Sequence, residues 1–267
     1  MCSTCGCSED ENIGVHVSHS HGGSEDHTHT NERRSATVSR ATRLVRVEQD
    51  ILARNASIAA HNRAWFAQRR VLALNVMSSP GAGKTTLLER TIRVLSGSPP
   101  VMVIEGDQET ALDAARIRQA GARAVQINTG SGCHLDAAML SLAIAELDPP
   151  ISSLVMIENV GNLVCPALFD LGESVRVVVM SVTEGEDKPL KYPNMFRFAD
   201  IMILNKTDLL PHLHFQPDEC VRYARRVNPR LEILPLSAAT GDGLDAWCEW
   251  LRKQTPPAVP AHTDTRG

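Results

Sequence analysis

The chain has 267 residues and a formal net charge of −4, and hydrophobic residues make up 43% of it. This length can bury the core of one large α/β domain and leaves room for a smaller appendage. The slightly acidic balance excludes the strongly basic surface typical of proteins that bind nucleic acid. Because we find neither an apolar run of transmembrane length nor a basic-then-apolar signal peptide, we expect a cytoplasmic protein that contacts no membrane.

Residues 1–34 form a segment rich in serine, glycine, histidine and acidic residues, with almost no large aliphatic side chains. Such a segment cannot bury a core, and we expect it to be disordered without a ligand. It contains Cys2, Cys5 and Cys7, three of the seven cysteines of the chain. Their thiolates and the α-amine could bind Ni(II) or Zn(II), and the histidines that follow could add weak metal sites. A redox-active or incidental cysteine-rich end is the alternative.

Residues 35–69 have apolar side chains near helical spacing, and Ser35 is a suitable N-cap, so we predict a helix there. From residue 71, apolar runs rich in β-branched side chains alternate with helical stretches. This alternation predicts a mostly parallel sheet flanked by helices, which we assign to a domain over 70–254, followed by a flexible tail over 255–267. The expected strands are 71–77, 101–105, 124–127, 154–157, 175–179, 201–204 and 231–236. The expected helices are 85–95, 111–120, 136–147, 218–227 and 244–253.

The sequence SSPGAGKTT, which begins at Ser78, lies between a predicted strand and a predicted helix. This is the context of a P-loop, in which glycines let backbone N–H groups face phosphate oxygens at a helix N-terminus. Lys84 would contact the β- and γ-phosphates, and the hydroxyl of Thr85 would bind Mg²⁺. The strict pattern has glycine at the place of Ser78. We expect the phosphates to be contacted by Gly81, Ala82, Gly83, Lys84, Thr85 and Thr86.

An N-K-x-D pattern formed by Asn205, Lys206 and Asp208 follows the predicted strand over 201–204. The Asp208 carboxylate can accept from the ring N–H and the amine of guanine together, whereas adenine would leave it unpaired. The stem of Lys206 can cover the face of the base. Ser237 and Ala238 match a loop whose backbone N–H groups meet the guanine oxygen. The P-loop and these motifs, in this order, predict a protein that binds GTP and GDP.

Asp107 and Glu158 stand at the ends of predicted strands and are candidates for binding Mg²⁺ and for orienting the attacking water. Glu158 occupies the place where GTPases usually have the aspartate of a D-x-x-G pattern. We predict that Lys84, Asp107 and Glu158 are catalytic, and that Thr85, Asp107 and Glu158 surround Mg²⁺. Which of the two carboxylates contacts the ion directly stays open, and an ordinary surface acid is the alternative for each.

A second group of metal-binding side chains comprises Cys133, His134 and Cys165, in segments that follow strand ends near the nucleotide. The three could form a metal site that leaves one position for water or for a ligand from a second subunit. A buried cysteine of the core is the alternative interpretation. Cys220 and Cys248 lie in helical patterns, and we interpret them as structural.

Together these motifs resemble the HypB family of hydrogenase nickel-incorporation GTPases over nearly the whole chain. The motifs are MCSTCGC, SSPGAGKTT, IEGDQET, GCHLD, ENVGNLVCP, SVTEGEDKP and NKTD. The resemblance implies a P-loop NTPase fold of the SIMIBI class and a GTPase that pairs face to face as a homodimer when GTP is bound. It also implies delivery of nickel to the large-subunit precursor of NiFe-hydrogenase, with a HypA-like accessory protein as partner.

The resemblance also assigns metals to the cysteines. It implies a tight nickel site at Cys2, Cys5 and Cys7, found in some members only. It implies a second site for Ni²⁺ or Zn²⁺ at Cys133, His134 and Cys165, near the dimer interface.

Other functions stay open. A nickel-storage protein would use the N-terminal thiols and histidines, and its hydrolysis would be incidental. A urease-type maturation GTPase would share the fold, although Cys2–Cys7 and the Cys165 segment argue against it. A ribosomal or signalling GTPase would not need this ligand set. Because Cys165 lies seven residues after Glu158, we expect nucleotide state and metal affinity to be linked.

Overall fold

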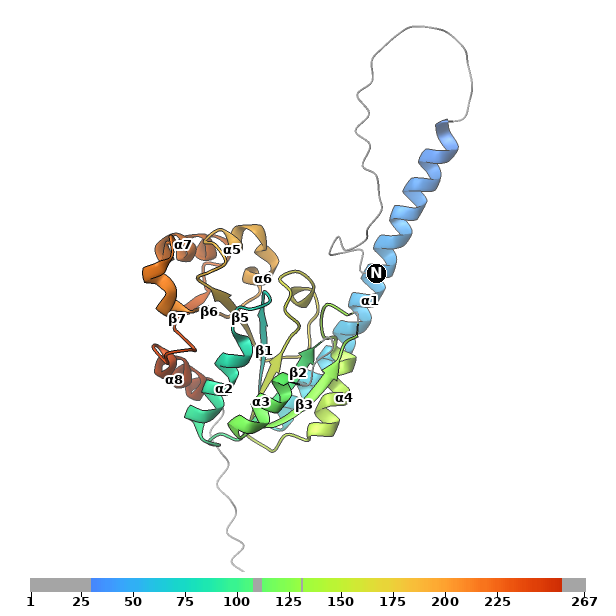
Figure 1. The fold of residues 1–267 in the computed structure, drawn as a ribbon. Coiled ribbons are helices and arrows are strands. Elements are labelled where there is room, and N and C mark those ends of the chain that lie inside the picture. Colours follow the sequence, from blue (N-terminus) through green and yellow to red (C-terminus); the bar gives the residue numbers. More distant parts are fainter. Residues whose placement is uncertain (1–29, 108–111, 131, 256–267) are drawn as a thin grey trace, which may run out of the picture. The chain divides into compact units, whose positions relative to one another are not determined.

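The computed structural model describes residues 30–107, 112–130 and 132–255, which contain a seven-stranded sheet covered by helices (Figure 1). All paired strands run parallel, in the order β3-β2-β4-β1-β5-β6-β7. The predicted α/β fold with a parallel sheet is therefore confirmed. Every strand begins and ends within two residues of the limits that the sequence predicted. The strands are β1 (Leu72–Ser78), β2 (Val101–Asp107), β3 (Arg123–Asn128), β4 (Leu154–Glu158), β5 (Val175–Ser181), β6 (Ile201–Asn205) and β7 (Glu232–Pro235).

Eight α-helices and two 3₁₀ turns are present in the described ranges. The helices are α1 (Thr30–Gln68), α2 (Lys84–Leu95), α3 (Leu112–Ala120), α4 (Ala137–Leu147), α5 (Lys188–Lys191), α6 (Pro193–Arg197), α7 (Pro217–Val227) and α8 (Leu244–Gln254), and the turns are η1 (Cys165–Ala167) and η2 (Thr207–His212). The short elements α5, α6, η1 and η2 were not predicted, because they hold too few residues to show an apolar period. None of the helices in these ranges combines the length and apolar character of a membrane span.

The N-terminal helix differs from its prediction at one end. It begins at Thr30, so Ser35 lies inside it and is not its N-cap. The residues between them include Glu32, Arg33 and Arg34, which are good helix formers and let the helix extend upstream. Residues 30–34, which we expected to be disordered, are therefore helical. The proposed thiol site of Cys2, Cys5 and Cys7 and the rest of the segment expected to be disordered, residues 1–29, lie outside the described residues, as does the tail from 256.

The chain forms two compact units, and the boundary between them lies inside α1. The first unit ends at Arg54 and the second begins at Asn55. The second unit contains the sheet and the C-terminal part of α1. Asn55, Asn62 and Phe66 from this part of the helix are buried in that unit. The end of α1 therefore belongs structurally to the sheet domain.

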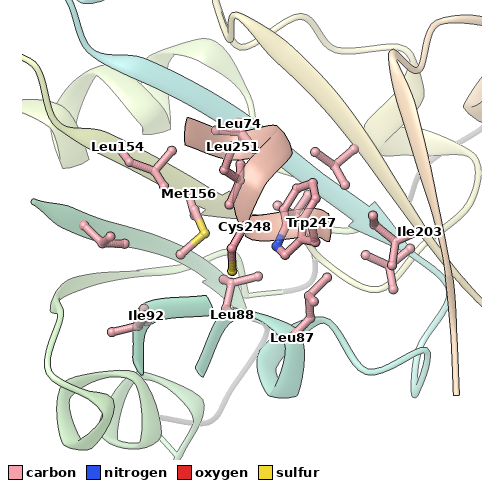
Figure 2. Close-up of a cluster of buried hydrophobic side chains, with 14 of the residues drawn as sticks. Leu74, Leu87, Leu88, Ile92, Leu154, Met156, Ile203, Trp247, Cys248 and Leu251 are labelled. Atoms are coloured by element: carbon pink, nitrogen blue, oxygen red, sulfur yellow. The ribbon is translucent and has the colours of Figure 1, made fainter. Parts of the chain in front are cut away.

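Side chains alternate between the two faces of the central strand β1, as the pleat of a strand requires. Leu74 and Val76 belong to an apolar cluster with α2 and α8. Ala73 belongs to a cluster with α4 and the end of α1. Figure 2 shows the first cluster, in which Trp247 of α8 packs near Leu87 of α2. The sheet is therefore buried on both faces, as its continuous apolar runs predicted.

Trp247 is the largest side chain of that cluster, being 1% exposed, and its Nε1 donates to the hydroxyl of Thr91 at 3.0 Å. We expect Trp247→Ala to lower the free energy of unfolding by about 3–5 kcal/mol, because it leaves a cavity and removes the hydrogen bond that the Thr91 hydroxyl accepts. Trp250→Ala is the matched control, since Trp250 is only partly buried and should cost clearly less. Chemical denaturation measures both, and equal losses would contradict this account of the core.

The parallel arrangement brings the carboxyl ends of β1, β2, β4 and β6 to one edge of the sheet. Loops at this edge follow Ser78, Asp107, Glu158 and Asn205. Ligands of open α/β sheets bind in the crevice outside such strand ends. The fold thus collects the predicted nucleotide motifs in one place.

Candidate functional site

A cleft of about 580 Å³ opens at the carboxyl ends of β1, β2 and β4. Most of the predicted phosphate-binding residues line it, together with Glu158 and Lys206. The P-loop members of this lining are Gly81, Gly83, Lys84, Thr85 and Thr86. Ala82 does not line the cleft, because its side chain is buried behind the loop.

Gly83 is the point at which the P-loop meets the N-K-x-D segment. Its φ is +98°, and a Cβ atom there would lie 2.5 Å from Nδ2 of Asn205, so only glycine fits. Asn205 donates from Nδ2 to the carbonyl oxygen of Ala82 at 2.8 Å, and its Oδ1 accepts from the N–H of Ala238 at 3.0 Å. Asn205 therefore ties the P-loop to the loop after β7.

Lys84 is buried in the cleft wall, and its Nζ donates to the hydroxyl of Ser78 at 2.8 Å. The Ser78 hydroxyl in turn donates to the carbonyl of Ser79 at 2.6 Å. The serine that replaces the usual glycine thus provides an oxygen partner for the lysine ammonium. This bond holds Nζ in the cleft that the phosphates would enter.

Glu158 ends β4 opposite the P-loop, and its Oε1 accepts from the hydroxyl of Thr85 at 2.8 Å. Burial raises the pKa of Glu158 to about 6. Its Oε2 is also buried and has no hydrogen-bond partner among the described residues. A desolvated carboxylate beside a threonine hydroxyl is a donor set that suits Mg²⁺. Asp107 ends β2, but its side chain lies outside what the structure describes.

The predicted base-recognition residues lie next to the P-loop. Lys206 has a φ of +63° and donates from Nζ to the carbonyl of Gly81 at 2.7 Å. Its side chain therefore reaches the P-loop. The Ser237 hydroxyl donates to Oδ1 of Asp208 at 2.5 Å, which orients the carboxylate.

The structure places a positively charged side chain in the cleft that the sequence did not reveal. Arg116 of α3 lines the cleft and contacts both carboxylate oxygens of Glu89 at 3.1 Å and Oδ1 of Asp113 at 2.9 Å. The only signal in the sequence was the spacing of Asp113 and Arg116, which suits a helical i, i+3 pair. Such pairs are common on solvated helices and do not by themselves indicate a site. Glu105, buried in the same wall, was also missed.

The predicted metal ligands Cys133, His134 and Cys165 are brought together. Their ligand atoms all lie within 4.8 Å of one another, and Sγ of Cys133 is 3.6 Å from Nδ1 of His134. Burial lowers the pKa of His134, which favours the neutral imidazole that binds metals. The imidazole stacks on the ring of Phe169, with centroids 3.8 Å apart. Two sulfurs and one imidazole suit zinc or nickel.

A buried amide links the loop after β4 to the segment that carries two of the metal ligands. Asn159 follows Glu158 and is 1% exposed. Its Oδ1 accepts from the N–H of Leu135, the residue after His134, at 3.2 Å, and its Nδ2 donates to Asn75 at 3.1 Å. A residue that lines the nucleotide cleft is therefore hydrogen-bonded to the neighbour of a metal ligand. The sequence motifs assigned no role to Asn159.

Cys220 and Cys248 are fully buried in the apolar clusters, as expected of structural cysteines. Burial raises the pKa of both thiols, that of Cys220 to about 12. They therefore remain protonated near neutral pH and are poor metal ligands.

Residues 72–235 match the model of the CobW/HypB/UreG family, nucleotide-binding domain. Hydrogenase maturation factor HypB of Azotobacter vinelandii is 57% identical over 223 residues, which cover 84% of this chain and 74% of that protein. The crystal structure of HypB from Archaeoglobus fulgidus aligns with a TM-score of 0.71 at 38% identity, covering 75% of this chain and 98% of that one. The structure of HypB from Helicobacter pylori in complex with nickel aligns with a TM-score of 0.71 at 35% identity, covering 77% and 99%.

Proposed function

Because this chain belongs to the HypB hydrogenase maturation factors within the CobW/HypB/UreG family, we propose that it is a nickel-binding GTPase. It acts as a metallochaperone, and its hydrolysis of GTP to GDP and phosphate supports nickel insertion into the large-subunit precursor of NiFe-hydrogenase. The observation that carries this proposal is the hydrogen bond by which Asn159, in the wall of the P-loop cleft, holds Leu135, the residue next to the Cys₂His ligand set.

In the proposed reaction the chain binds and orients GTP with its P-loop. The backbone N–H groups at the start of α2 hold the phosphates, and Lys84 exchanges its Ser78 partner for β- and γ-phosphate oxygens. Thr85 and Glu158, with Asp107, would hold Mg²⁺, which supplies positive charge against the phosphate oxygens when bound. Glu158 and Asp107 orient the water that attacks the γ-phosphorus. The bond between the γ-phosphorus and the oxygen that bridges it to the β-phosphate breaks, and GDP leaves with the electron pair of that bond.

Nickel is the cargo in this proposal and is held by Cys133, His134 and Cys165. Three protein ligands leave a coordination position for a group of the acceptor or of a second subunit. Zn²⁺ fits the same ligands and is the alternative occupant. The N-terminal thiols of Cys2, Cys5 and Cys7 form a separate capture site. We propose a homodimer, a HypA-like accessory protein and the hydrogenase precursor as partners, and the cytoplasm as the location.

Nucleotide state and nickel affinity are linked in this mechanism. A shift of Glu158 toward a bound nucleotide moves Asn159, which contacts the backbone beside His134. Linkage is reciprocal, so nickel changes the affinity for GTP by the same factor.

A nickel titration of the full chain, with and without a non-hydrolysable GTP analogue and with size measurement, tests this function. We expect saturable nickel binding whose affinity changes with the analogue, together with dimer formation. Nickel binding that ignores the nucleotide would favour the storage function. Deletion of residues 1–34 separates the two further, because a storage protein would lose its role whereas a delivery GTPase keeps hydrolysis.

We expect Asp208→Asn to weaken GTP binding by about 100-fold or more, because the amide cannot accept both guanine donors. Xanthosine triphosphate should then bind better than GTP, since xanthine carries a carbonyl oxygen where guanine carries its amine. Asp242→Asn is the matched control, because among the described residues the Asp242 carboxylate accepts a hydrogen bond only from the nearby Thr240. Titration with fluorescent nucleotides measures both variants, and unchanged GTP preference in Asp208→Asn would exclude its assigned role.

A further inference from the structure

The C-terminal part of α1 lies directly against the loop that follows Cys165. Gly172 in this loop has a φ of +89°, and a Cβ atom there would lie 2.4 Å from the carbonyl oxygen of Ala59 and 2.8 Å from the backbone nitrogen of Arg63. The helix backbone and the loop are thus in contact with no room for a side chain. Arg63 adds a bidentate ion pair to Asp170, with oxygens at 2.7 and 2.8 Å.

Two buried asparagines of α1 each bridge the same two segments of the chain. Asn55 donates from Nδ2 to the carbonyl of Asp170 at 2.7 Å and accepts at Oδ1 from the N–H of Ala137 at 2.8 Å. Asn62 donates from Nδ2 to the carbonyls of Ala137 at 2.8 Å and of Leu171 at 3.1 Å. Their exposed fractions are 8% and 2%. Loss of a hydrogen bond to a buried backbone group destabilises the folded state, so these bonds hold the two segments firmly.

These two segments carry the metal ligands. Ala137 lies three residues after His134, at the first turn of α4. Asp170 directly follows Phe169, whose ring stacks on the His134 imidazole, and Leu168 closes the turn that begins at Cys165. The amides of α1 therefore connect the two segments that carry the metal ligands.

We propose that Asn55 and Asn62 are positioning residues of the metal site formed by Cys133, His134 and Cys165. They hold the Cys133–His134 loop and the Cys165 loop at the spacing that a nickel or zinc ion needs. This inference rests on the proposed function for the identity of the ion. Groups outside the ligands that orient them change metal affinity by about 10–100-fold when removed, and we expect that range here.

The experiment uses the full chain with Cys2→Ser, Cys5→Ser and Cys7→Ser, so that Cys133 and Cys165 are the remaining thiols outside the apolar clusters of Cys220 and Cys248. Ni(II) alone is the probe. Its affinity is measured by competition with a chelator, and its thiolate-to-nickel absorption reports the sulfur ligands, to which the N-terminal histidines do not contribute. GTP affinity and the thermal unfolding midpoint of the metal-free protein are measured in parallel.

Three variants separate positioning from general stability. Asn62→Ala removes one bridge. Asn55→Asp keeps the acceptor for the Ala137 N–H but removes the donor to Asp170, so it breaks the bridge while the first turn of α4 stays capped. Asn228→Ala is the matched control, because Asn228 likewise donates to two carbonyls, those of Phe196 and Ala199, at 3.1 and 2.8 Å.

We expect Asn62→Ala and Asn55→Asp to weaken nickel binding about 10–100-fold and to alter the absorption band, while GTP affinity stays unchanged. Asn228→Ala should lower the unfolding midpoint and leave nickel binding as it was. If Asn62→Ala is unfolded at the assay temperature, the nickel affinity of Asn55→Asp decides whether the positioning role holds. Unchanged nickel affinity in the folded α1 variants, or an equal loss in Asn228→Ala, would overturn the positioning role. A parent protein that does not bind nickel would overturn the proposed function as well.

Discussion

Replacement of Glu158 by glutamine should lower GTP turnover by about 100-fold or more and at the same time stabilise the metal-free protein. The Glu158 carboxylate is desolvated, its pKa is raised to about 6, and its Oε2 has no hydrogen-bond partner in the described part of the chain. At pH 7 the folded state therefore holds a charge that the unfolded state solvates better. Glutamine removes this charge and can still accept from Thr85, so the free energy of unfolding should rise by about 1–2 kcal/mol.

The same substitution removes the negative oxygen that would face Mg²⁺ and the attacking water. Loss of one such electrostatic group typically lowers turnover by about 100-fold or more. Phosphate release under saturating GTP and chemical denaturation without metal measure the two effects. Glu232→Gln is the control, because Glu232 is exposed and its Oε2 accepts from Trp250 outside the cleft. A variant that is less stable than the parent, or that hydrolyses GTP normally, would show that Glu158 has another role.

The second large effect is expected at the metal ligands. Cys165→Ala should lower nickel affinity by more than the roughly 100-fold attributed to groups outside the ligand set, because it removes one of three ligand atoms. The dependence of nickel affinity on GTP should disappear with it. Both quantities are measured by nickel titration with and without a GTP analogue, in a chain whose three N-terminal thiols are replaced by serine.

Cys248→Ala provides the comparison for that experiment. Cys248 is as buried as Cys165 but packs in the apolar cluster of α2 and α8, away from His134. Cys248→Ala should lower the free energy of unfolding and leave nickel affinity and its dependence on GTP unchanged. If Cys165→Ala left both nickel affinity and its GTP dependence untouched, the proposed link between the two sites would be rejected.

Asn159 illustrates a feature of the site that motif analysis did not recover. Its position in the chain marks it only as the neighbour of Glu158. Its contacts with the N–H of Leu135 and with Asn75 join segments that are far apart in sequence. The same is true of Asn55 and Asn62, whose partners lie 75 to 115 residues away. An asparagine carries no periodic or spacing signal, so such bridges appear only when the chain is folded.

The sequence by itself determined the parallel α/β fold, the P-loop, the N-K-x-D pattern and the identity of the metal-ligand candidates. These features depend on local physics, since apolar period, glycine conformation and side-chain chemistry act within a few residues. Only the tertiary structure decided that Cys165 meets Cys133 and His134, that Ser78 partners Lys84, and that α1 holds the two ligand loops together. Those facts depend on distances between remote segments, which the packing of helices on the sheet sets and the linear order of residues does not contain.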